Sequence, residues 1–266
     1  MHLLCLVKIV PDVDDFRYDP ETNGLVRNNV RQILNPEDAT ALALAFALKK
    51  AFPETWIETV SMGPRSVLPH LEDLLRRGAN QVSLISDSLF TGSDTYVTSR
   101  ILARYIATRS VDWIFSGTHS LDGGTAHVPA QVAEALGLAH MGNIVSLDRT
   151  SVTQNRVTVD VDSEEAVYTF AVKGPAILGF AYAPHPKLPY IAYEDVQRNV
   201  QDRISRISNA ELGFAPHEVG TRGSLTKVGR LESAPLESKN PLVLQPDAHG
   251  VEQVYQFLAQ KGFVKA

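Results

Sequence analysis

Short apolar runs alternate with helix-like stretches through the first half of the chain, and this alternation limits the choice of fold more than any other feature. Runs rich in Val, Ile, Leu and Trp, typical of strands buried on both faces, lie at residues 3–9, 56–62, 81–85 and 111–116. Stretches with helical signals lie at residues 36–50, 64–77, 93–109 and 125–136. Strands that alternate with helices predict an α/β fold, with a mostly parallel sheet and helices on both of its faces.

Local start and stop signals support the expected helices. Asn35 is a suitable N-cap, Pro36 suits the first helical position, and the acids Glu37 and Asp38 complement the helix dipole. Gly78 and Gly137 follow two of the other helical stretches, where a glycine C-cap is common.

Two segments depart from the strand–helix alternation. Residues 11–34 are too long for an ordinary loop and predict a small hairpin inserted above the sheet. After residue 142 the period changes to two, which predicts an antiparallel hairpin over 157–161 and 167–173, followed by a buried strand over 176–182.

The last third of the chain is rich in proline and poor in large apolar residues. We expect a helical stretch near 193–203, a loose segment over 213–246 and a terminal helix over 248–261. The sequence therefore predicts an adenine-nucleotide-binding α/β domain over residues 1–190. A partner-recognition segment and an extended C-terminal arm over 191–266 are expected to pack on another surface.

Composition narrows the class of protein. The 266 residues carry 25 Lys and Arg against 30 Asp and Glu, and 44% of them are hydrophobic. This mild acidity suits a globular protein with a sizeable core and argues against a general nucleic-acid binder. A single cysteine, Cys5, excludes a disulfide framework and a CxxC redox pair. Without a targeting segment or a long apolar run, the expectation is a cytoplasmic chain with no membrane span.

One glycine-rich stretch has the features of an anion-binding loop. No GxGxxG and no GxxxxGK[ST] motif is present, but Gly123 and Gly124 follow a predicted strand and precede a predicted helix. Adjacent glycines let the backbone approach an anion, and a helix N-terminus offers free N–H groups. Thr125 is expected to cap that helix and to offer its hydroxyl to a phosphate. The residues alone fit an ordinary glycine loop with a threonine cap equally well.

Histidines near this loop raise the question of a metal or a hydrolytic site. His119, His127 and His140 lack the spacing of a metal motif, and no cysteine joins them. His119, Ser120 and Asp122 are sequence neighbours without a GxSxG elbow, which argues against a catalytic triad. We interpret His127 as a first-turn residue near the anion site and the other two histidines as surface residues.

Motifs in consistent order and spacing run from residue 1 to about residue 215, and together they resemble one known family. The motifs are Val7-Lys8, Gly24-Leu25-Val26, Asn35-Pro36-Glu37-Asp38, Ser61-Met62-Gly63-Pro64, Arg77-Gly78-Ala79, Gly117 with Asp122-Gly123-Gly124-Thr125-Ala126, and Glu211-Leu212-Gly213. On these residues the chain resembles the β subunit of electron transfer flavoprotein, a fold of the adenine nucleotide alpha hydrolase-like type.

The resemblance implies an electron carrier rather than a stand-alone catalyst. Members pair with an α subunit that holds most of an FAD, exchange electrons with a dehydrogenase or another redox partner, and bind AMP in the β subunit. A second branch of the family places another FAD in that pocket and bifurcates electrons taken from NADH, and this chain looks closer to it. The implied cofactor contacts are Leu6, Asn35, Pro36, Glu37, Asp38, Met62, Asp122, Gly123, Gly124, Thr125, Ala126, His127 and Val128.

The chain departs from the family pattern at two places. Gly124, His127 and Pro129 replace the usual acid, glutamine and glycine of the loop. The implied partner-recognition residues are Tyr193, Val196, Arg198 and Arg203, with a tyrosine where the family usually places an aliphatic anchor and with acids among the arginines. We therefore expect a redox partner other than the usual acyl-CoA dehydrogenase.

Two alternatives remain open on the sequence. One is an adenine-nucleotide-binding module of related fold, sensing or hydrolysing ATP without a redox role. The SGGxDS-type loop common in such enzymes is missing after the first apolar run, where Ile9-Val10-Pro11-Asp12 stands instead. The other is a binding module that has lost its nucleotide, because of the changes at Gly124, His127 and Pro129.

Overall fold

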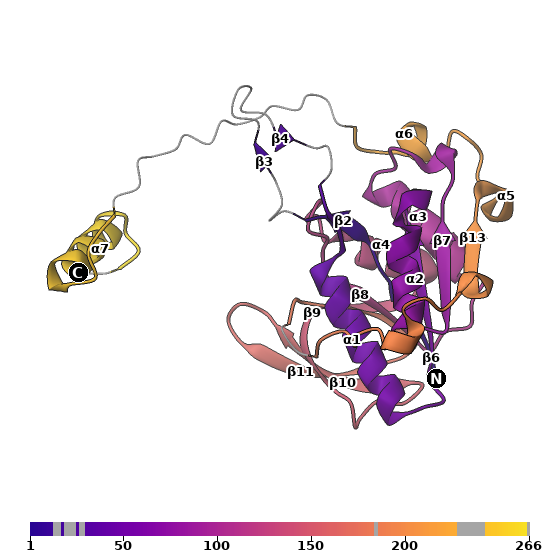
Figure 1. Cartoon of the computed structure of the whole chain (residues 1–266), viewed down its shortest axis with the longest axis horizontal. Helices are drawn as coiled ribbons and strands as arrows, with labels where there is room; N and C mark the ends of the chain where they lie inside the picture. Colours follow the sequence, from indigo (N-terminus) through magenta and orange to yellow (C-terminus); the bar gives the residue numbers. More distant parts are fainter. Residues whose placement is uncertain (13–16, 19–24, 27–29, 184–185, 228–242, 265–266) are drawn as a thin grey trace.

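A computed structural model describes residues 1–12, 17–18, 25–26, 30–183, 186–227 and 243–264. Its main sheet has nine strands in the order β11-β10-β9-β12-β8-β1-β6-β7-β13 (Figure 1). The strands are β1 (His2–Leu6), β6 (Trp56–Met62), β7 (Gln81–Ile85), β8 (Trp113–Gly117), β9 (Ala139–Asp148), β10 (Arg156–Asp162), β11 (Val167–Lys173), β12 (Ala176–Phe180) and β13 (Ile204–Ile207). The pairs from β9 through β12, β8, β1, β6 and β7 to β13 are parallel, and only β9–β10 and β10–β11 in this sheet are antiparallel. The predicted mostly parallel sheet is confirmed.

Helices cover both faces of this sheet, as predicted. One apolar cluster packs α1 (Pro36–Ala51) and α2 (Leu68–Arg76) on one face. A second cluster packs α3 (Thr95–Ile106), α4 (His127–Leu136) and the short α5 (Asn209–Leu212) on the other face. The central strands β8 and β12 are buried along their whole length, which explains why their sequences are continuous apolar runs.

The inserted hairpin is confirmed, although its first strand begins earlier than expected. The predicted strand over 3–9 divides into β1 and β2 (Ile9–Pro11), and β2 pairs antiparallel with β5 (Gln32–Leu34). Farther out, β3 (Arg17–Tyr18) pairs antiparallel with β4 (Leu25–Val26). Gly24 of the family-like motif lies outside the described residues.

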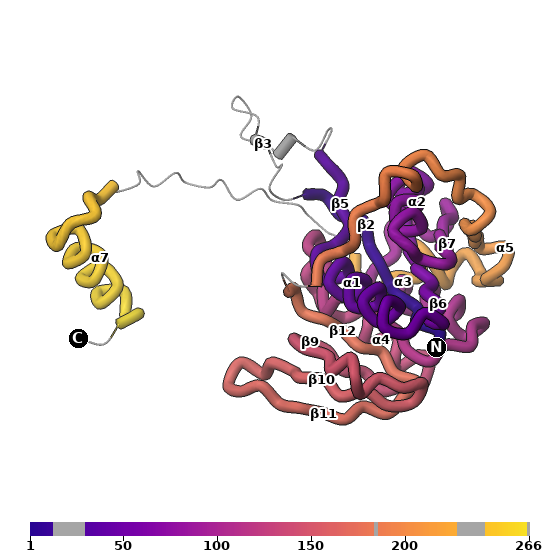
Figure 2. Tube along the Cα trace, turned by 60° about the horizontal axis from the view of Figure 1, so that its bottom comes forward, coloured from indigo at the N-terminus to yellow at the C-terminus, as the bar shows by residue number. Residues whose placement is uncertain are grey.

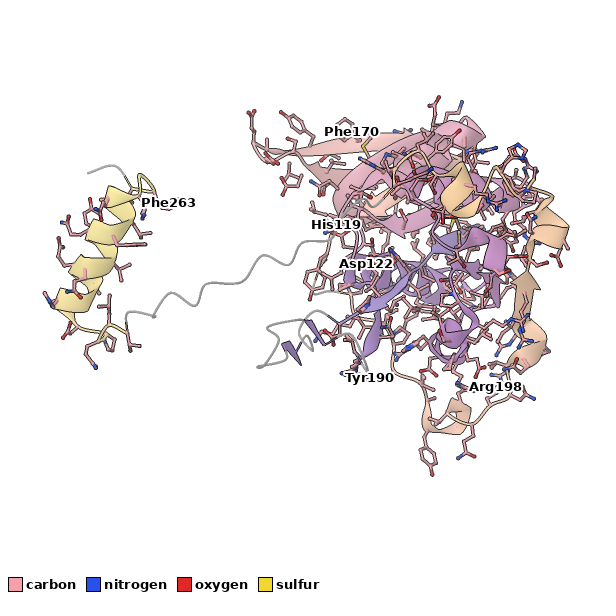
Figure 3. All side chains as sticks on the ribbon, turned by 90° about the horizontal axis from the view of Figure 1, so that it is seen from above. His119, Asp122, Phe170, Tyr190, Arg198 and Phe263 are labelled. Carbon is pink, nitrogen blue, oxygen red and sulfur yellow. The ribbon has the colours of Figure 1, made fainter. Side chains whose placement is uncertain are left out.

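The predicted second hairpin forms an antiparallel extension of the sheet made by β9, β10 and β11. Val157 and Val172 face each other in register and are buried, because this end of the extension lies against the core. Farther along the same face, Tyr168 and Phe170 remain 51% and 41% exposed. The extension therefore carries uncovered apolar side chains at its outer end, where Figure 3 labels Phe170.

The segment after residue 190 differs from the predicted helix. Residues 193–203 form two single turns, η4 (Tyr193–Asp195) and η5 (Gln201–Arg203), because the Asn199 side chain accepts the N–H of Gln201 at 3.1 Å and interrupts a helical ladder. β13 then pairs with β7 as an edge strand that the sequence did not predict. Residues beyond 190 thus complete the sheet, while the division of the chain at residue 190 stays a prediction.

The C-terminal helix is confirmed as α7 (Ala248–Gln260), and the short α6 (Gly220–Gly223) lies within the segment expected to be loose. Figures 1 and 2 draw α7 apart from the α/β body. Several of its apolar side chains are exposed, among them Val251, Val254 and Phe257. No helix among the described residues is long and apolar enough to cross a membrane.

Candidate functional site

The carboxyl ends of β1, β6 and β8 meet at one edge of the sheet, where α/β folds bind ligands. Leu6, the last residue of β1, is buried in the apolar cluster under α3 and α4. Met62 at the end of β6 and Val128 in the first turn of α4 are partly buried and pack against the same cluster. Three of the predicted contact residues therefore form an apolar floor.

The start of α1 holds the loop after β8 through side-chain hydrogen bonds. The Asn35 amide donates to the carbonyl of His119 at 2.9 Å and accepts the N–H of Leu121 at 3.0 Å, so it does not cap its own helix. Glu37 accepts the N–H of His119 at 2.7 Å and lies 3.0 Å from the His119 Nδ1. Asn35 and Glu37 are buried, so these bonds fix the loop from its inner side.

Asp38 joins three separate segments at this edge. Its Oδ1 accepts the N–H of Gly117 and its Oδ2 accepts the N–H of Lys8, each at 2.8 Å. Burial raises the pKa of Asp38 from 3.8 to about 7, against the opposing effect of these two hydrogen bonds. Gly117 has no room for a side chain, because a Cβ there would lie 2.6 Å from the Asp38 Oδ1. Pro36 occupies the first turn of α1, as predicted.

The expected threonine cap is wrong. α4 begins at His127 after Ala126, whose φ is 54°, and no side chain caps it. Pro129 explains this start, since a cap at Thr125 would place the proline where the first intrahelical N–H is needed. Starting at His127 places the proline in the first turn, where a missing N–H is tolerated.

The tip of the loop presents its backbone to solvent. Gly124 has a φ of 60°, a left-handed conformation that favours glycine, and its N–H donates to the Ser120 carbonyl at 2.8 Å. The exposed residues of the tip are Leu121, Asp122, Gly123, Gly124, Thr125, Ala126 and His127. The first-turn N–H groups of His127 and Val128 precede any intrahelical acceptor. The loop can therefore offer backbone donors to an anion.

Sequence reasoning missed Lys8 as part of this site. The Lys8 Nζ lies 2.7 Å from the Asp122 Oδ1 and 3.5 Å from the Ser120 Oγ, across the mouth of the loop. Burial pushes the pKa of Asp122 up, but hydrogen bonds from Lys8 and Ser120 outweigh it and hold the pKa below its ordinary value. A lysine directly after the first buried strand was the available signal, because that position lies at the ligand-binding edge of the sheet.

The predicted partner-recognition residues lie elsewhere, along α2. Tyr193 is 97% exposed, Val196 is exposed, and Arg198 pairs with Asp195 at 3.2 Å. The Arg198 carbonyl accepts a hydrogen bond from Arg76 of α2, and the Arg203 guanidinium donates to the Ala79 carbonyl. Figure 3 shows Arg198 and Tyr190 away from His119 and Asp122. The structure thus separates two sets of predicted residues.

A metal centre finds no support in the described part of the chain, where no three His, Cys, Asp or Glu side chains gather as a metal set. The loop instead offers backbone N–H groups and one ammonium as donors, next to the apolar floor. Such a set fits a phosphate-bearing nucleotide better than a cation.

The chain is similar to known proteins along most of its length. The profile of the "Electron transfer flavoprotein domain" family matches residues 22–183. The chain is 29% identical over 244 residues to the caffeyl-CoA reductase–Etf complex subunit CarD of Acetobacterium woodii, covering 91% of this chain and 92% of that one. It is 30% identical over 229 residues to electron transfer flavoprotein subunit beta of Thermoanaerobacterium thermosaccharolyticum, covering 86% of each. With protein FixA of Rhizobium meliloti it shares 30% identity over 237 residues, 87% of this chain and 80% of that one.

Proposed function

This chain belongs to the electron transfer flavoprotein domain family, and from that premise we propose that it is the β subunit of a heterodimeric electron transfer flavoprotein. The proposal follows from the relatives that carry this name and align along most of the chain. In this function the chain shuttles electrons between a dehydrogenase or NADH and an acceptor, together with an α subunit. The single buried Cys5 accords with a reducing compartment such as the cytoplasm.

The observation that carries the nucleotide assignment is the glycine loop held by Asn35, Glu37 and Asp38. These buried side chains bond to the loop at Gly117, His119 and Leu121 and hold its backbone in place. A preorganised loop loses little conformational entropy on binding. We assign AMP or a second FAD to this site, with its phosphate at the loop and its apolar part over Leu6, Met62 and Val128.

A flavin, when bound, supplies the redox chemistry, and the side chains of this chain hold and orient it. Asn35 and Glu37 set the position of the loop backbone, while Leu6, Met62 and Val128 exclude water from the base of the site. Within the site described here, no side chain acts as a nucleophile toward the reacting atoms.

We favour the bifurcating branch of the family on two motifs. Asn35-Pro36-Glu37-Asp38 and Asp122-Gly123-Gly124-Thr125-Ala126 resemble the residues of that branch. In that branch this pocket would hold a second FAD, with Met62 beside it, and the FAD would supply the chemistry by which electrons from NADH reach two acceptors. Pro129 leaves the loop with one donor fewer, and His127 offers a further donor beside it.

Two uncovered apolar surfaces are suited to the α subunit. Tyr168 and Phe170 project from the outer end of β11, and Val251, Val254 and Phe257 from α7. Leu244 and Pro246 form a groove of about 430 Å³ with α7. Apolar side chains gathered in this way mark interaction sites on proteins of this size. We assign both surfaces to the α subunit, and the exposed Tyr193 and Val196 to the redox partner, which we infer is not the usual acyl-CoA dehydrogenase.

The experiment is to produce the chain with its α subunit, denature the purified complex, and identify the released nucleotides by chromatography. Two FAD per heterodimer support the bifurcating assignment, and one FAD with one AMP supports an ordinary carrier. A complex that releases no nucleotide would refute both. For the partner, efficient reduction of the complex by a standard acyl-CoA dehydrogenase would refute the inference drawn from Tyr193.

A further inference from the structure

Lys8 joins the start of α1 to the mouth of the glycine loop. Its backbone N–H is bound by the buried Asp38, and its carbonyl accepts the N–H of Asn35 at 2.8 Å. The backbone of Lys8 is therefore fixed to the start of α1. Its side chain extends across the loop mouth, so that the ammonium meets Asp122 at 2.7 Å.

The ion pair that Lys8 makes with Asp122 is easily exchanged. The Lys8 side chain is 46% exposed and that of Asp122 is 35% exposed. Exposed ion pairs of this kind contribute little to stability, because both partners are well hydrated when apart. A phosphate accepts charge-assisted hydrogen bonds from an ammonium as a carboxylate does. The ammonium can thus leave Asp122 for a phosphate without loss of the fold.

The loop otherwise offers a phosphate only neutral donors and unfavourable charges. Gly124 already donates to Ser120, and Pro129 has no N–H to offer. Glu37 is bound to His119 on the inner side of the loop, and Asp122 adds a negative charge at its mouth. A cation at this place therefore adds to the neutral N–H groups of His127 and Val128 and offsets the charge of Asp122, and the Lys8 ammonium lies there.

We infer that Lys8 is a phosphate ligand of this site, whose ammonium moves from Asp122 to a phosphate group of the bound adenine nucleotide. The inference rests on the proposed nucleotide site. In this inference Asp122 pairs with the Lys8 ammonium and keeps it over the loop until the nucleotide phosphate takes its place. Two roles at the mouth are thereby separated: the ammonium recognises phosphate, while the apolar floor recognises the rest of the nucleotide.

The experiment compares AMP with adenosine, which differ only in the phosphate. Both are titrated by calorimetry into the complex of this chain with its α subunit, after removal of bound nucleotide. Lys8→Met should weaken AMP binding about tenfold or more and leave adenosine binding within about twofold. Asp122→Asn should raise the ratio of AMP to adenosine affinity, because the lysine loses its competing partner. Lys8→Arg should retain most of the AMP affinity.

Lys50→Met is the matched control, since it removes the same charge from an exposed position at the far end of α1. It should leave the AMP-to-adenosine ratio unchanged, and circular dichroism should show every variant folded. Equal loss of AMP and adenosine in Lys8→Met would make Lys8 a loop-positioning residue and overturn the inference. A wild-type complex that binds neither compound would instead overturn the nucleotide site, and with it this inference.

Discussion

The carboxylate of Asp38, at the start of α1, accepts a 2.8 Å hydrogen bond from the N–H of Gly117, which lies 79 positions later at the end of β8. The same carboxylate accepts the N–H of Lys8 after β1. One buried side chain thus fastens a helix and two strands at the edge where the glycine loop begins. The glycine is required for this contact, because any larger residue would displace the carboxylate.

At pH 4 Asp38→Asn should destabilise the fold by about 1–3 kcal/mol, because both oxygens of the protonated carboxyl group can still accept, whereas the amide NH₂ would leave one of the two backbone donors unsatisfied. The loss should depend on pH. Burial raises the pKa of Asp38 from 3.8 to about 7, so the folded chain holds this proton more tightly than the unfolded chain. The contribution of Asp38 is therefore full below about pH 3.8 and is lost as the pH rises toward 7.

Urea denaturation of both proteins between pH 4 and 7 checks this prediction. The difference in unfolding free energy between wild type and Asp38→Asn should narrow as the pH rises. A difference that widens with pH would show that the carboxylate is stabilised as an anion.

Tyr105→Phe should destabilise the chain by about 1–3 kcal/mol, because the Tyr105 hydroxyl bonds to the buried Glu58 at 2.5 Å and to Ser83 at 2.6 Å. Burial acts to raise the pKa of Glu58, but the nearby His2 imidazole, the hydrogen bond from Tyr105 and the charge of Arg109 outweigh it and lower the pKa. The Glu58 carboxylate, 3.5 Å from the His2 Nε2, raises the pKa of His2, against the opposing effect of burial.

These two shifts define a pH window. The Glu58 contribution is present above its ordinary pKa of 4.5 and is lost as the pH falls, while that of His2 is present below 6.5 and is lost as the pH rises. Stability from the pair should therefore be greatest between these values. Glu58→Gln should flatten this part of the stability profile, and the exposed Glu54→Gln should not; equal profiles for the two variants would contradict the assignment.

Gly117→Ala and Gly123→Ala should differ sharply in their effect on stability. A Cβ at Gly117 meets Asp38 and Glu37 at 2.6 Å, so the variant should lose at least about 2 kcal/mol of stability. A Cβ at Gly123 meets only the Ser120 Oγ, at 3.4 Å. Gly123→Ala with Thr125→Val should therefore keep the melting temperature but release more nucleotide during purification. Unchanged nucleotide content would count against the loop as the site.

Tyr193→Ala should leave stability within about 0.5 kcal/mol of wild type, because the side chain is almost wholly exposed. If the tyrosine is the anchor for the redox partner, the variant should slow electron transfer from that partner about tenfold or more. Stopped-flow measurement of flavin reduction checks this. Tyr182→Ala, which removes another exposed tyrosine, serves as the control and should transfer electrons at the wild-type rate.

Val254→Asp should weaken assembly with the α subunit, because it places a charge in the apolar groove of α7. Gln253→Asp adds the same charge to a neighbouring exposed position of the helix and should assemble normally. Analytical ultracentrifugation of each mixture measures the heterodimer. Equal assembly of both variants would remove α7 from the proposed interface.

Hydrophobic periodicity and helix start and stop residues were enough to predict the main elements of the α/β fold, and the motifs were enough to predict the family. Apolar runs and the Asn35-Pro36 start predicted the strands and α1, because these signals depend on neighbours within one turn or strand. The same local reasoning failed at Thr125, where Pro129 moves the helix start, and at 193–203, where Asn199 interrupts the helix.

What only the tertiary structure decided is which distant residues meet. The pairing of β13 with β7, of Asp38 with Gly117 and of Lys8 with Asp122 joins segments separated by scores of positions. A local sequence pattern does not predict such contacts, because they form only when packing of the two apolar clusters brings the strand ends to one edge of the sheet. The sequence by itself determined the kind of fold and the loop; the burial of the α1 carboxylates determined how that loop is held.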